Sequence, residues 1–185
     1  MSAKIFQLPY IGYDNFQGLE LLYTAAGEFS VIVRIENAVT ELSADERGYI
    51  SYQELLMQII KTLGEGYILS KQDVFVAGRF LGCETQGYLQ KAYDEHFYGR
   101  RKVELYSYLV ITRKVERSRF YVYNEKSLHN FKSAVAKVLG TLNEGNLKPQ
   151  LLDKSALDQY IGRCLSMDFS SLHITRNNFF AKEDR

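Results

Sequence analysis

The sequence lacks tryptophan, has only two cysteines and shows no excess of either charge. Its 23 basic and 22 acidic residues leave a formal net charge of +1, so no overall field draws the chain to nucleic acid or to anionic lipid. Cys83 and Cys164 belong to no CxxC or Cys/His pattern, and we expect two reduced, partly buried thiols. His96, His129 and His173 show no i, i+4 pairing, which argues against a zinc site.

Segments that would carry the chain into or across a membrane are missing as well. Residues 1–9 hold no apolar core of a signal peptide, and no apolar run approaches the roughly 18 residues that span a bilayer. A GxxxxGK[ST] phosphate loop is also absent. Gly64 and Gly66 lack the third glycine of a dinucleotide fingerprint and follow a predicted helix, so they indicate a helix end. We therefore expect a cytoplasmic protein without a cofactor.

The composition is that of an ordinary globular protein with many aromatic residues. The chain has 185 residues, which suits one domain. Its 14 Tyr and 11 Phe must largely pack in a core or at an interface. No linker divides the sequence. We expect an arm or edge segment over residues 1–26, a single α+β domain over 27–168 and a polar tail over 169–185.

The spacing of apolar residues predicts an α+β sandwich with a mostly antiparallel sheet. The core order is strand, helix, strand, strand, helix, strand, which is the split βαβ plan of a ferredoxin-like domain. An inserted helix and an extra C-terminal helix are added to this plan. Strands are predicted over 19–23, 27–35, 67–80, 103–112 and 147–152, and helices between 43 and 64, over 85–98, between 127 and 145, and from 153 or 155 to 165.

Local signals predict the ends and the buried faces of the helices. Ser43 and Glu46 form a capping box, in which the Ser43 hydroxyl accepts a hydrogen bond from the backbone N–H of Glu46. Ser127 is the predicted cap of the later long helix. The predicted inward stripes are Tyr49, Tyr52, Leu56, Ile59, Ile60 and Leu63 in the first helix, Leu89, Ala92, Tyr93, His96 and Phe97 in the inserted helix, and Leu128, Phe131, Val135, Val138 and Leu142 in the long helix.

His96 is the one histidine with carboxylates close by in the sequence. It adjoins Asp94 and Glu95, and Asp73 precedes them. A catalytic pair needs a carboxylate that is oriented onto the imidazole, whereas adjacent helical residues point in different directions. We interpret His96 as a half-buried residue that closes the inserted helix against the sheet. A small hydrolase that uses His96 with Asp73 or Asp94 is one alternative function.

Two basic clusters, residues 100–102 and 113–119, mark the ends of the strand predicted over 103–112, roughly 30 Å apart at ~3.3 Å per residue. Charge runs are usually solvated, but a docking surface for another protein is a further interpretation. Basic residues interleaved with aromatic ones also suit single-stranded nucleic acid, so a nucleic-acid-binding module is a second alternative, although Glu104, Glu116 and Glu125 dilute the positive charge. The docking patch would comprise Arg113, Lys114, Arg117, Arg119, Tyr121 and Tyr123.

A family resemblance lies in residues 67–112. Its motifs are Lys71-Gln72-Asp73 with Phe75, then Leu89, Tyr93 and Glu95-His96-Phe97 with Arg100, then a Tyr-Leu strand that ends at Thr112. This pattern resembles the N-terminal domain of TraG-like conjugation ATPases, which are VirB-type traffic ATPases of type IV secretion carried on conjugative transposons. The resemblance runs from about Gly27 to Lys114 and continues more weakly to Leu165.

The resemblance implies a non-catalytic α+β domain that docks a conjugation ATPase to inner-membrane parts of the secretion channel. In this family the Walker motifs lie in a RecA-like C-terminal domain, so no catalytic residue carries over. The implied partners are other channel subunits and the ATPase domain of the parent protein, with self-association left open. They would hold the chain at the cytoplasmic face of the inner membrane. The resemblance also implies a polar cluster that ties the inserted helix to the sheet, formed by Lys71, Gln72, Asp73, His96 and Arg100.

Overall fold

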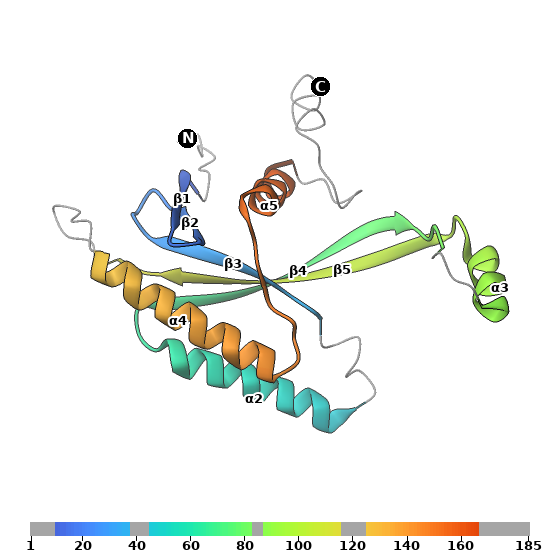
Figure 1. Ribbon diagram of the computed structural model, residues 1–185, viewed down its shortest axis with the longest axis horizontal. Coiled ribbons are helices and arrows are strands. Elements are labelled where there is room, and N and C mark those ends of the chain that lie inside the picture. Colours follow the sequence, from blue (N-terminus) through green and yellow to red (C-terminus); the bar gives the residue numbers. More distant parts are fainter. Residues whose placement is uncertain (1–9, 38–44, 83–86, 116–124, 167–185) are drawn as a thin grey trace, which may run out of the picture. The chain divides into compact units, whose positions relative to one another are not determined.

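A computed structural model describes residues 10–37, 45–82, 87–115 and 125–166 (Figure 1). Within these residues the fold is α+β, with a six-stranded sheet and four helices. In chain order the elements are β1 Gly12–Phe16, β2 Leu19–Tyr23, β3 Phe29–Ile35, α2 Glu46–Leu63, β4 Tyr67–Arg79, α3 Tyr88–Phe97, β5 Arg101–Arg113, α4 Glu125–Glu144, β6 Gln150–Leu151 and α5 Lys154–Ser166.

The sheet confirms the predicted ferredoxin-like plan. Its strand order is β1-β2-β3-β5-β4, and β6 pairs with β3 off this path. Along one edge, β3 pairs antiparallel with β5, from Phe29 opposite Arg113 to Ile35 opposite Ser107. The other edge of β3 pairs with two strands, with β2 at residues 29–30 and with β6 at residues 33–34. Without the β1–β2 hairpin, the order β6-β3-β5-β4 is that of a split βαβ domain.

The described chain forms two compact units, and the boundary between them runs through β4 and β5. The first unit comprises Met1–Gln72 and Ser107–Lys154, and the second comprises Asp73–Tyr106 and Ser155–Arg185. The first therefore holds most of the sheet with α2 and α4. The second holds the outer halves of β4 and β5, the inserted helix α3, and α5. No helix of the described segments is long and apolar enough to cross a membrane.

The core of the first unit lies between the sheet and the pair of helices α2 and α4, which run side by side (Figure 1). Phe131 of α4 is fully buried, with its ring edge-on to Phe29 at 4.9 Å and stacked on Tyr67 at 6.2 Å. Aromatic pairs of this kind stabilise a core beyond the area that they bury. The predicted inward stripe of α4 is confirmed in full, since its buried residues are Leu128, Phe131, Val135, Val138 and Leu142.

The predicted helix caps were wrong. The N-cap of α2 is Asp45, whose backbone is extended and whose side chain accepts a hydrogen bond from the backbone N–H of Arg47 at 3.1 Å. Ser43 lies outside the described residues, and Glu46 is already helical. Likewise α4 begins at Glu125, so Ser127 lies inside its first turn. Both regions hold several residues that can cap a helix, and the sequence alone does not choose among them.

The inward stripe of α2 is narrower than predicted. Tyr52, Ile59 and Leu63 are buried, while Tyr49 and Ile60 are 44% and 50% exposed. Each residue turns the helix by about 100°, so the buried residues, which are spaced by seven and four positions, keep to one side. Tyr49 and Ile60 lie on the flank of that side, where they are only half covered.

The second unit contains a hairpin of strand segments with α3 inserted at its end. The predicted helix over 85–98 is confirmed as α3, although it begins at Tyr88, and Cys83 and Thr85 lie outside the described residues. In this unit Val74, Val76 and Leu157 are buried. Cys164 of α5 is half-buried and reduced, as predicted.

Candidate docking site at the end of the β4–β5 hairpin

Backbone hydrogen bonds attach α3 to the hairpin. The Phe80 N–H donates to the Arg100 carbonyl at 2.9 Å, and the Gly99 N–H donates to the Phe80 carbonyl at 2.8 Å. The Arg100 N–H in turn donates to the Phe97 carbonyl at 3.1 Å. Gly99 has a φ of +74°, a backbone conformation that favours glycine. These bonds hold the C-terminal end of α3 against the point where β4 ends and β5 begins.

Aromatic rings attach one side of the helix. Tyr93 lies edge-on to Phe80 with ring centroids 6.1 Å apart, and its ring is 4.4 Å from that of Phe97. Two cations extend the cluster, with the Arg100 guanidinium 5.0 Å from the Phe97 ring and the Lys102 ammonium 6.0 Å from the Phe80 ring. Both distances are within the range of cation–π attraction. Phe80, which directly follows β4, therefore forms one aromatic and basic cluster with residues of α3 and with Arg100 and Lys102 around the start of β5.

The inward face predicted for α3 was wrong, because none of its residues is buried. Only Phe97 of the predicted stripe is half-buried, while Leu89 is 82% exposed and Tyr93 is 52% exposed. Tyr88, at the start of the helix, is 85% exposed. The periodicity correctly shows an apolar side, but the described chain covers it only in part, at the contact between Tyr93 and Phe80. Leu81 and Tyr98, which flank α3 in the sequence, are also exposed, at 71% and 65%.

A basic rim borders the apolar surface of α3. Arg100 comes three residues after the last residue of α3, and Arg101 and Lys102 begin β5. Arg79, at the end of β4, donates from Nη1 to the Gly99 carbonyl at 3.1 Å. The predicted basic cluster 100–102 is thus adjacent to α3. Since Asp94 and Glu95 are the acidic residues of this helix, the rim is mixed in charge with a cationic excess.

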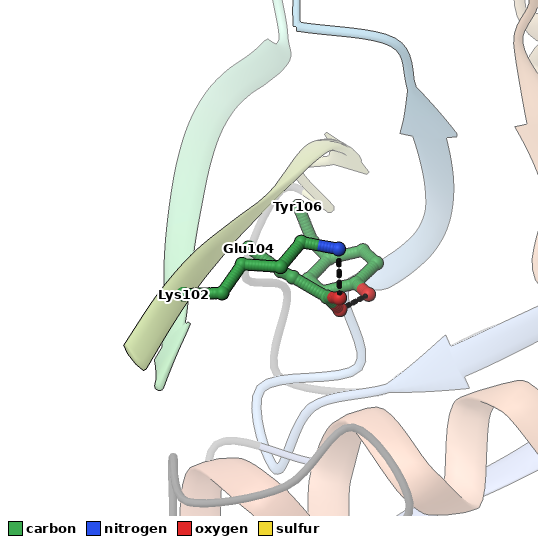
Figure 2. Close-up of polar contacts among 3 residues, drawn as sticks. All are labelled: Lys102, Glu104 and Tyr106. Atoms are coloured by element: carbon green, nitrogen blue, oxygen red, sulfur yellow. Dashed lines mark hydrogen bonds and ion pairs between the residues drawn. The ribbon is translucent and has the colours of Figure 1, made fainter. Parts of the chain in front are cut away.

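Glu104 is tied to two neighbours on the same face of β5 (Figure 2). Tyr106 donates a hydrogen bond from its hydroxyl to Glu104 Oε2 at 2.5 Å, and Lys102 Nζ lies 2.9 Å from Oε1. The Tyr106 hydrogen bond first, and then Lys102, lower the pKa of Glu104, against a small opposing effect of burial. Both carboxylate oxygens are therefore engaged. The sequence interpretation treated Glu104 only as a dilution of basic charge. Positions i, i+2 and i+4 of a strand share a face, and this signal could have identified the row.

The residues that carry the family resemblance occupy two different places. Arg100 and His96 are in contact, with 3.1 Å between Arg100 Nη2 and His96 Nε2. A guanidinium can only donate, so His96 Nε2 accepts the hydrogen bond in this geometry. Lys71, Gln72 and Asp73 are consecutive exposed residues of β4. Asp73 precedes the end of that strand at Arg79 by about 20 Å, at ~3.3 Å per residue. The expectation that His96 is half-buried was wrong, because its side chain is exposed.

The predicted docking patch is described only in part. Arg113 is half-buried, and its guanidinium donates to the Glu65 carbonyl at 3.0 Å and lies 4.6 Å from the Tyr67 ring. Lys114 is exposed. Arg113 thus supports the turn between α2 and β4. The remaining residues of the patch, Arg117, Arg119, Tyr121 and Tyr123, lie outside the described residues.

No group of three or more His, Cys, Asp or Glu residues that could hold a metal ion occurs in the described part of the chain. No protein-family model matches the chain, and no curated protein matches it. Fold and site together define a ferredoxin-like α+β module that carries an exposed apolar helix with a basic rim.

Proposed function

We propose that this chain is a non-catalytic assembly domain of a conjugation ATPase of type IV secretion, and that α3 docks it to another subunit of the secretion channel. The observation that carries the proposal is that α3 has an apolar side and no buried residue. The resemblance of residues 67–112 to TraG-like N-terminal domains supplies the biological setting. The α+β fold agrees with that resemblance.

A helix as short as α3 needs external support, because isolated helices below about 12–15 residues are marginal in water. The Phe80–Tyr93–Phe97 cluster gives that support on one side only. Burying an exposed leucine such as Leu89 in an interface is worth about 1.5–3 kcal/mol. Tyrosine and arginine are enriched among the residues that dominate binding energy. Tyr88 adjoins Leu89 in α3, and Arg100 lies near the C-terminal end of the helix.

The chemistry of the surface specifies the chemistry of the partner. An apolar stripe bordered by Arg79, Arg100, Arg101 and Lys102 fits an apolar groove or helix that is flanked by acidic residues. Charge complementarity of this kind speeds encounter and selects partners more than it adds affinity. We therefore propose that the partner subunit is acidic around its contact.

No specific observation supports either alternative function, the hydrolase or the single-strand-binding module. A hydrolase needs an imidazole lone pair that can take a proton from a nucleophile or water, and in this structure His96 Nε2 already accepts from Arg100. Single-strand binding needs aromatic faces on which bases can stack, and the faces of Tyr93 and Phe97 are turned partly toward each other at 4.4 Å.

The test uses Leu89→Asp in the full parent protein, with Met57→Asp on α2 as the matched control because Met57 is 54% exposed on a different helix. We expect Leu89→Asp to reduce DNA transfer between cells by about tenfold or more, as loss of roughly 1.4 kcal/mol of docking energy would. Met57→Asp should transfer normally. A photo-crosslinking residue at position 89 should capture a channel subunit with acidic residues near the crosslink.

Two results would reject the proposal. One is normal transfer by Leu89→Asp. The other is tight single-strand binding by the purified chain, measured by fluorescence anisotropy, which falls steeply with salt and is lost in Leu89→Asp. The melting temperature of both variants should match that of the unmodified chain, which separates loss of docking from loss of folding.

A further inference from the structure

The outer halves of β4 and β5 form a two-stranded ribbon that ends at α3 and lies wholly within the second unit (Figure 1). Its register follows from the hydrogen bond that the Phe80 N–H donates to the Arg100 carbonyl at 2.9 Å. Gly78 agrees with this register, since a Cβ atom built there would lie 3.9 Å from the Lys102 carbonyl oxygen. Counted back along the antiparallel strands, three pairs of opposite residues follow: Arg79 with Arg101, Ala77 with Val103, and Phe75 with Leu105.

The two faces of this ribbon differ in how far they are covered. Side chains alternate between the faces of a strand, so the even-numbered residues of both strands share one face. Val74 and Val76 are buried on that face, and Figure 2 shows the Lys102–Glu104–Tyr106 row, which belongs to it. The odd-numbered face is open, because Phe75 is 62% exposed and Val103 is 66% exposed.

The open face is apolar where a solvated face is normally polar. In antiparallel sheets with one packed face, the other face usually carries polar side chains. Here it carries two adjacent apolar pairs and then a pair of arginines, and an exposed apolar patch with a polar rim marks an interaction site. We call this surface the ribbon face, and it comprises Phe75, Ala77, Arg79, Arg101, Val103 and Leu105.

Two arginines close the ribbon face at the end nearest α3. Arg79 lies directly opposite Arg101, and like charges in that arrangement are destabilising. Arg79 Nη1 donates to the Gly99 carbonyl at 3.1 Å, which holds this guanidinium at the end of the ribbon. A carboxylate placed between the two guanidinium groups would accept hydrogen bonds from both and offset their repulsion. The ribbon face therefore fits an occupant that has apolar side chains followed by an acidic one.

We propose that the ribbon face binds an amphipathic helix of a partner protein, with apolar residues at i and i+4 and an acidic residue at i+8. Successive pairs on one face of a ribbon are about 6.8 Å apart, and residues i and i+4 of a helix are about 6 Å apart along its axis. The apolar residues then cover the Phe75–Leu105 and Ala77–Val103 pairs, and the carboxylate reaches the arginines. A helix is about 10–12 Å across, which is enough to cover two strands that lie about 4.8 Å apart.

Charge and size favour this occupant over a second copy of the chain. The ribbon face holds no acidic residue, so two such faces packed together would leave both arginine pairs without a carboxylate. A stable interface between proteins takes about 20–30 residues from each side, and the ribbon face supplies far fewer. One helix, recognised through a few apolar anchors along one of its sides, matches a surface of this size.

A synthetic peptide supplies the helix for the test. It has about 15 residues and is stapled on the side away from the contact, because isolated helices of that length are marginal in water. It carries leucine at i and i+4 and glutamate at i+8. The unmodified chain should bind this glutamate peptide in a fluorescence-anisotropy titration. The matched peptide with glutamine at i+8 should bind about tenfold or more weakly in Kd, since it lacks the charged acceptor for the arginines.

Variants of the ribbon face should act on defined parts of the peptide. Val103→Asp should abolish binding. Arg101→Glu should weaken the glutamate peptide by about tenfold or more in Kd and should bind a peptide with lysine at i+8 in its place. Lys61→Glu, which makes the same charge change at an exposed position of α2, should change neither affinity. Melting temperatures establish that each variant is folded. If Arg101→Glu does not fold, Arg101→Gln replaces it and should reduce the preference for glutamate over glutamine.

The absence of tryptophan from the sequence allows the contact to be located. Phe75→Trp places a single indole on the ribbon face, and its emission should shift to shorter wavelength when the peptide is added. Ile60→Trp is the matched control, because Ile60 is 50% exposed on α2, and its emission should not change.

Three results would overturn the proposal. One is no binding of the glutamate peptide at about 1 mM, the weakest affinity at which such a contact is meaningful. Another is equal binding of the glutamate and glutamine peptides. The third is binding of the chain to phosphatidylserine vesicles that Val103→Asp abolishes while the peptide does not compete, which would assign the ribbon face to an anionic lipid surface.

This inference does not rest on the proposed function, because it concerns other residues than those of α3. Leu89→Asp should bind the glutamate peptide as the unmodified chain does, and Val103→Asp should retain the photo-crosslink from position 89. Either proposal can therefore fail while the other holds.

Discussion

The guanidinium of Arg113 occupies the space into which a side chain at Gly66 would project. A Cβ atom built on Gly66 would lie 2.6 Å from Arg113 Nη1, and Gly66 has a φ of +78°. The same guanidinium donates to the Glu65 carbonyl. The turn between α2 and β4 is therefore closed by an arginine from β5, and glycine at position 66 is required both for the backbone conformation and for the contact.

Replacing Gly66 by alanine should destabilise the chain by about 1–2 kcal/mol from the left-handed backbone alone, with a further loss because Arg113 must move. Gly18→Ala is the control, since Gly18 also has a positive φ, +83°, but nothing lies within 4 Å of its added Cβ. Denaturant unfolding measures both. If Gly66→Ala costs no more than Gly18→Ala, the contact with Arg113 does not stabilise the turn.

Two adjacent isoleucines of α2 should differ sharply in their contribution to stability. Ile59 is fully buried and Ile60 is 50% exposed, and both are replaced by alanine in the same helix. We expect a loss of about 2–5 kcal/mol for Ile59→Ala, the cost of truncating a buried aliphatic side chain. For Ile60→Ala we expect a change within about 0.5 kcal/mol, as is usual for surface substitutions. Equal effects in chemical denaturation would contradict the observed face of α2.

Glu104 should make stability depend on pH. Its folded-state pKa is lowered from an ordinary value of 4.5 by the Tyr106 hydrogen bond and by Lys102. A depressed carboxyl pKa gives stability that is present above the ordinary value and lost as pH falls through the lowered one. The difference in unfolding free energy between the unmodified chain and Glu104→Gln should therefore shrink as pH falls below 4.5.

The size of this effect is limited, because the Glu104 side chain is about one-third exposed and pairs of that kind contribute at most about 1 kcal/mol. Tyr106→Phe removes the donor with the larger influence and leaves the carboxyl in place. It should reproduce part of the loss with the same direction of pH dependence. A difference between Glu104→Gln and the unmodified chain that stays constant from neutral pH to below pH 4.5 would count against this account.

The aromatic attachment of α3 should control its local opening. Phe97→Ala removes contacts with Tyr93, His96 and Arg100, so we expect faster amide hydrogen exchange across residues 88–97 with little change in the global unfolding free energy. Leu89→Ala, at an 82% exposed position of the same helix, is the matched control and should exchange as the unmodified helix does. Equal protection in the two variants would show that the rings do not hold the helix.

The fold could be predicted from the sequence wherever the spacing of apolar residues is compatible with only one packing arrangement. The inward residues of α4 emerged in full because its apolar positions fill a single stripe and its other sides are polar. The strand order also followed, since alternation in β3 and β5 and the helical periodicity of α2 and α4 leave few arrangements other than a split βαβ sheet. The division of the chain into two units could not be predicted from the sequence. The boundary between Gln72 and Asp73 falls inside a strand, and no linker marks it.

The site was harder to predict for a reason that α3 makes clear. Amphipathicity states which side of a helix is apolar, and it does not state whether another element lies there to cover it. Leu89 and His96 were assigned to an interior on periodicity alone, and both are exposed. Glu104 was overlooked for a different reason. Its role depends on Lys102 and Tyr106, which lie on the same face of β5 as Glu104. This arrangement can be found in the sequence only if the alternation of faces along a strand is followed for charged residues as well as for apolar ones.

The shared edge of β3 also constrains how the chain can fold. Leu22 pairs with Ser30 across a short loop, whereas Val33 pairs with Leu151 across more than a hundred intervening residues. Pairings of such long sequence separation slow folding, since loop closure must precede the contact. During synthesis the β1–β2–β3 meander can therefore assemble early. The part of the β3 edge that pairs with β6 stays unpaired until β6 has left the ribosome. During synthesis the nascent chain therefore exposes backbone N–H and C=O groups along this part of β3.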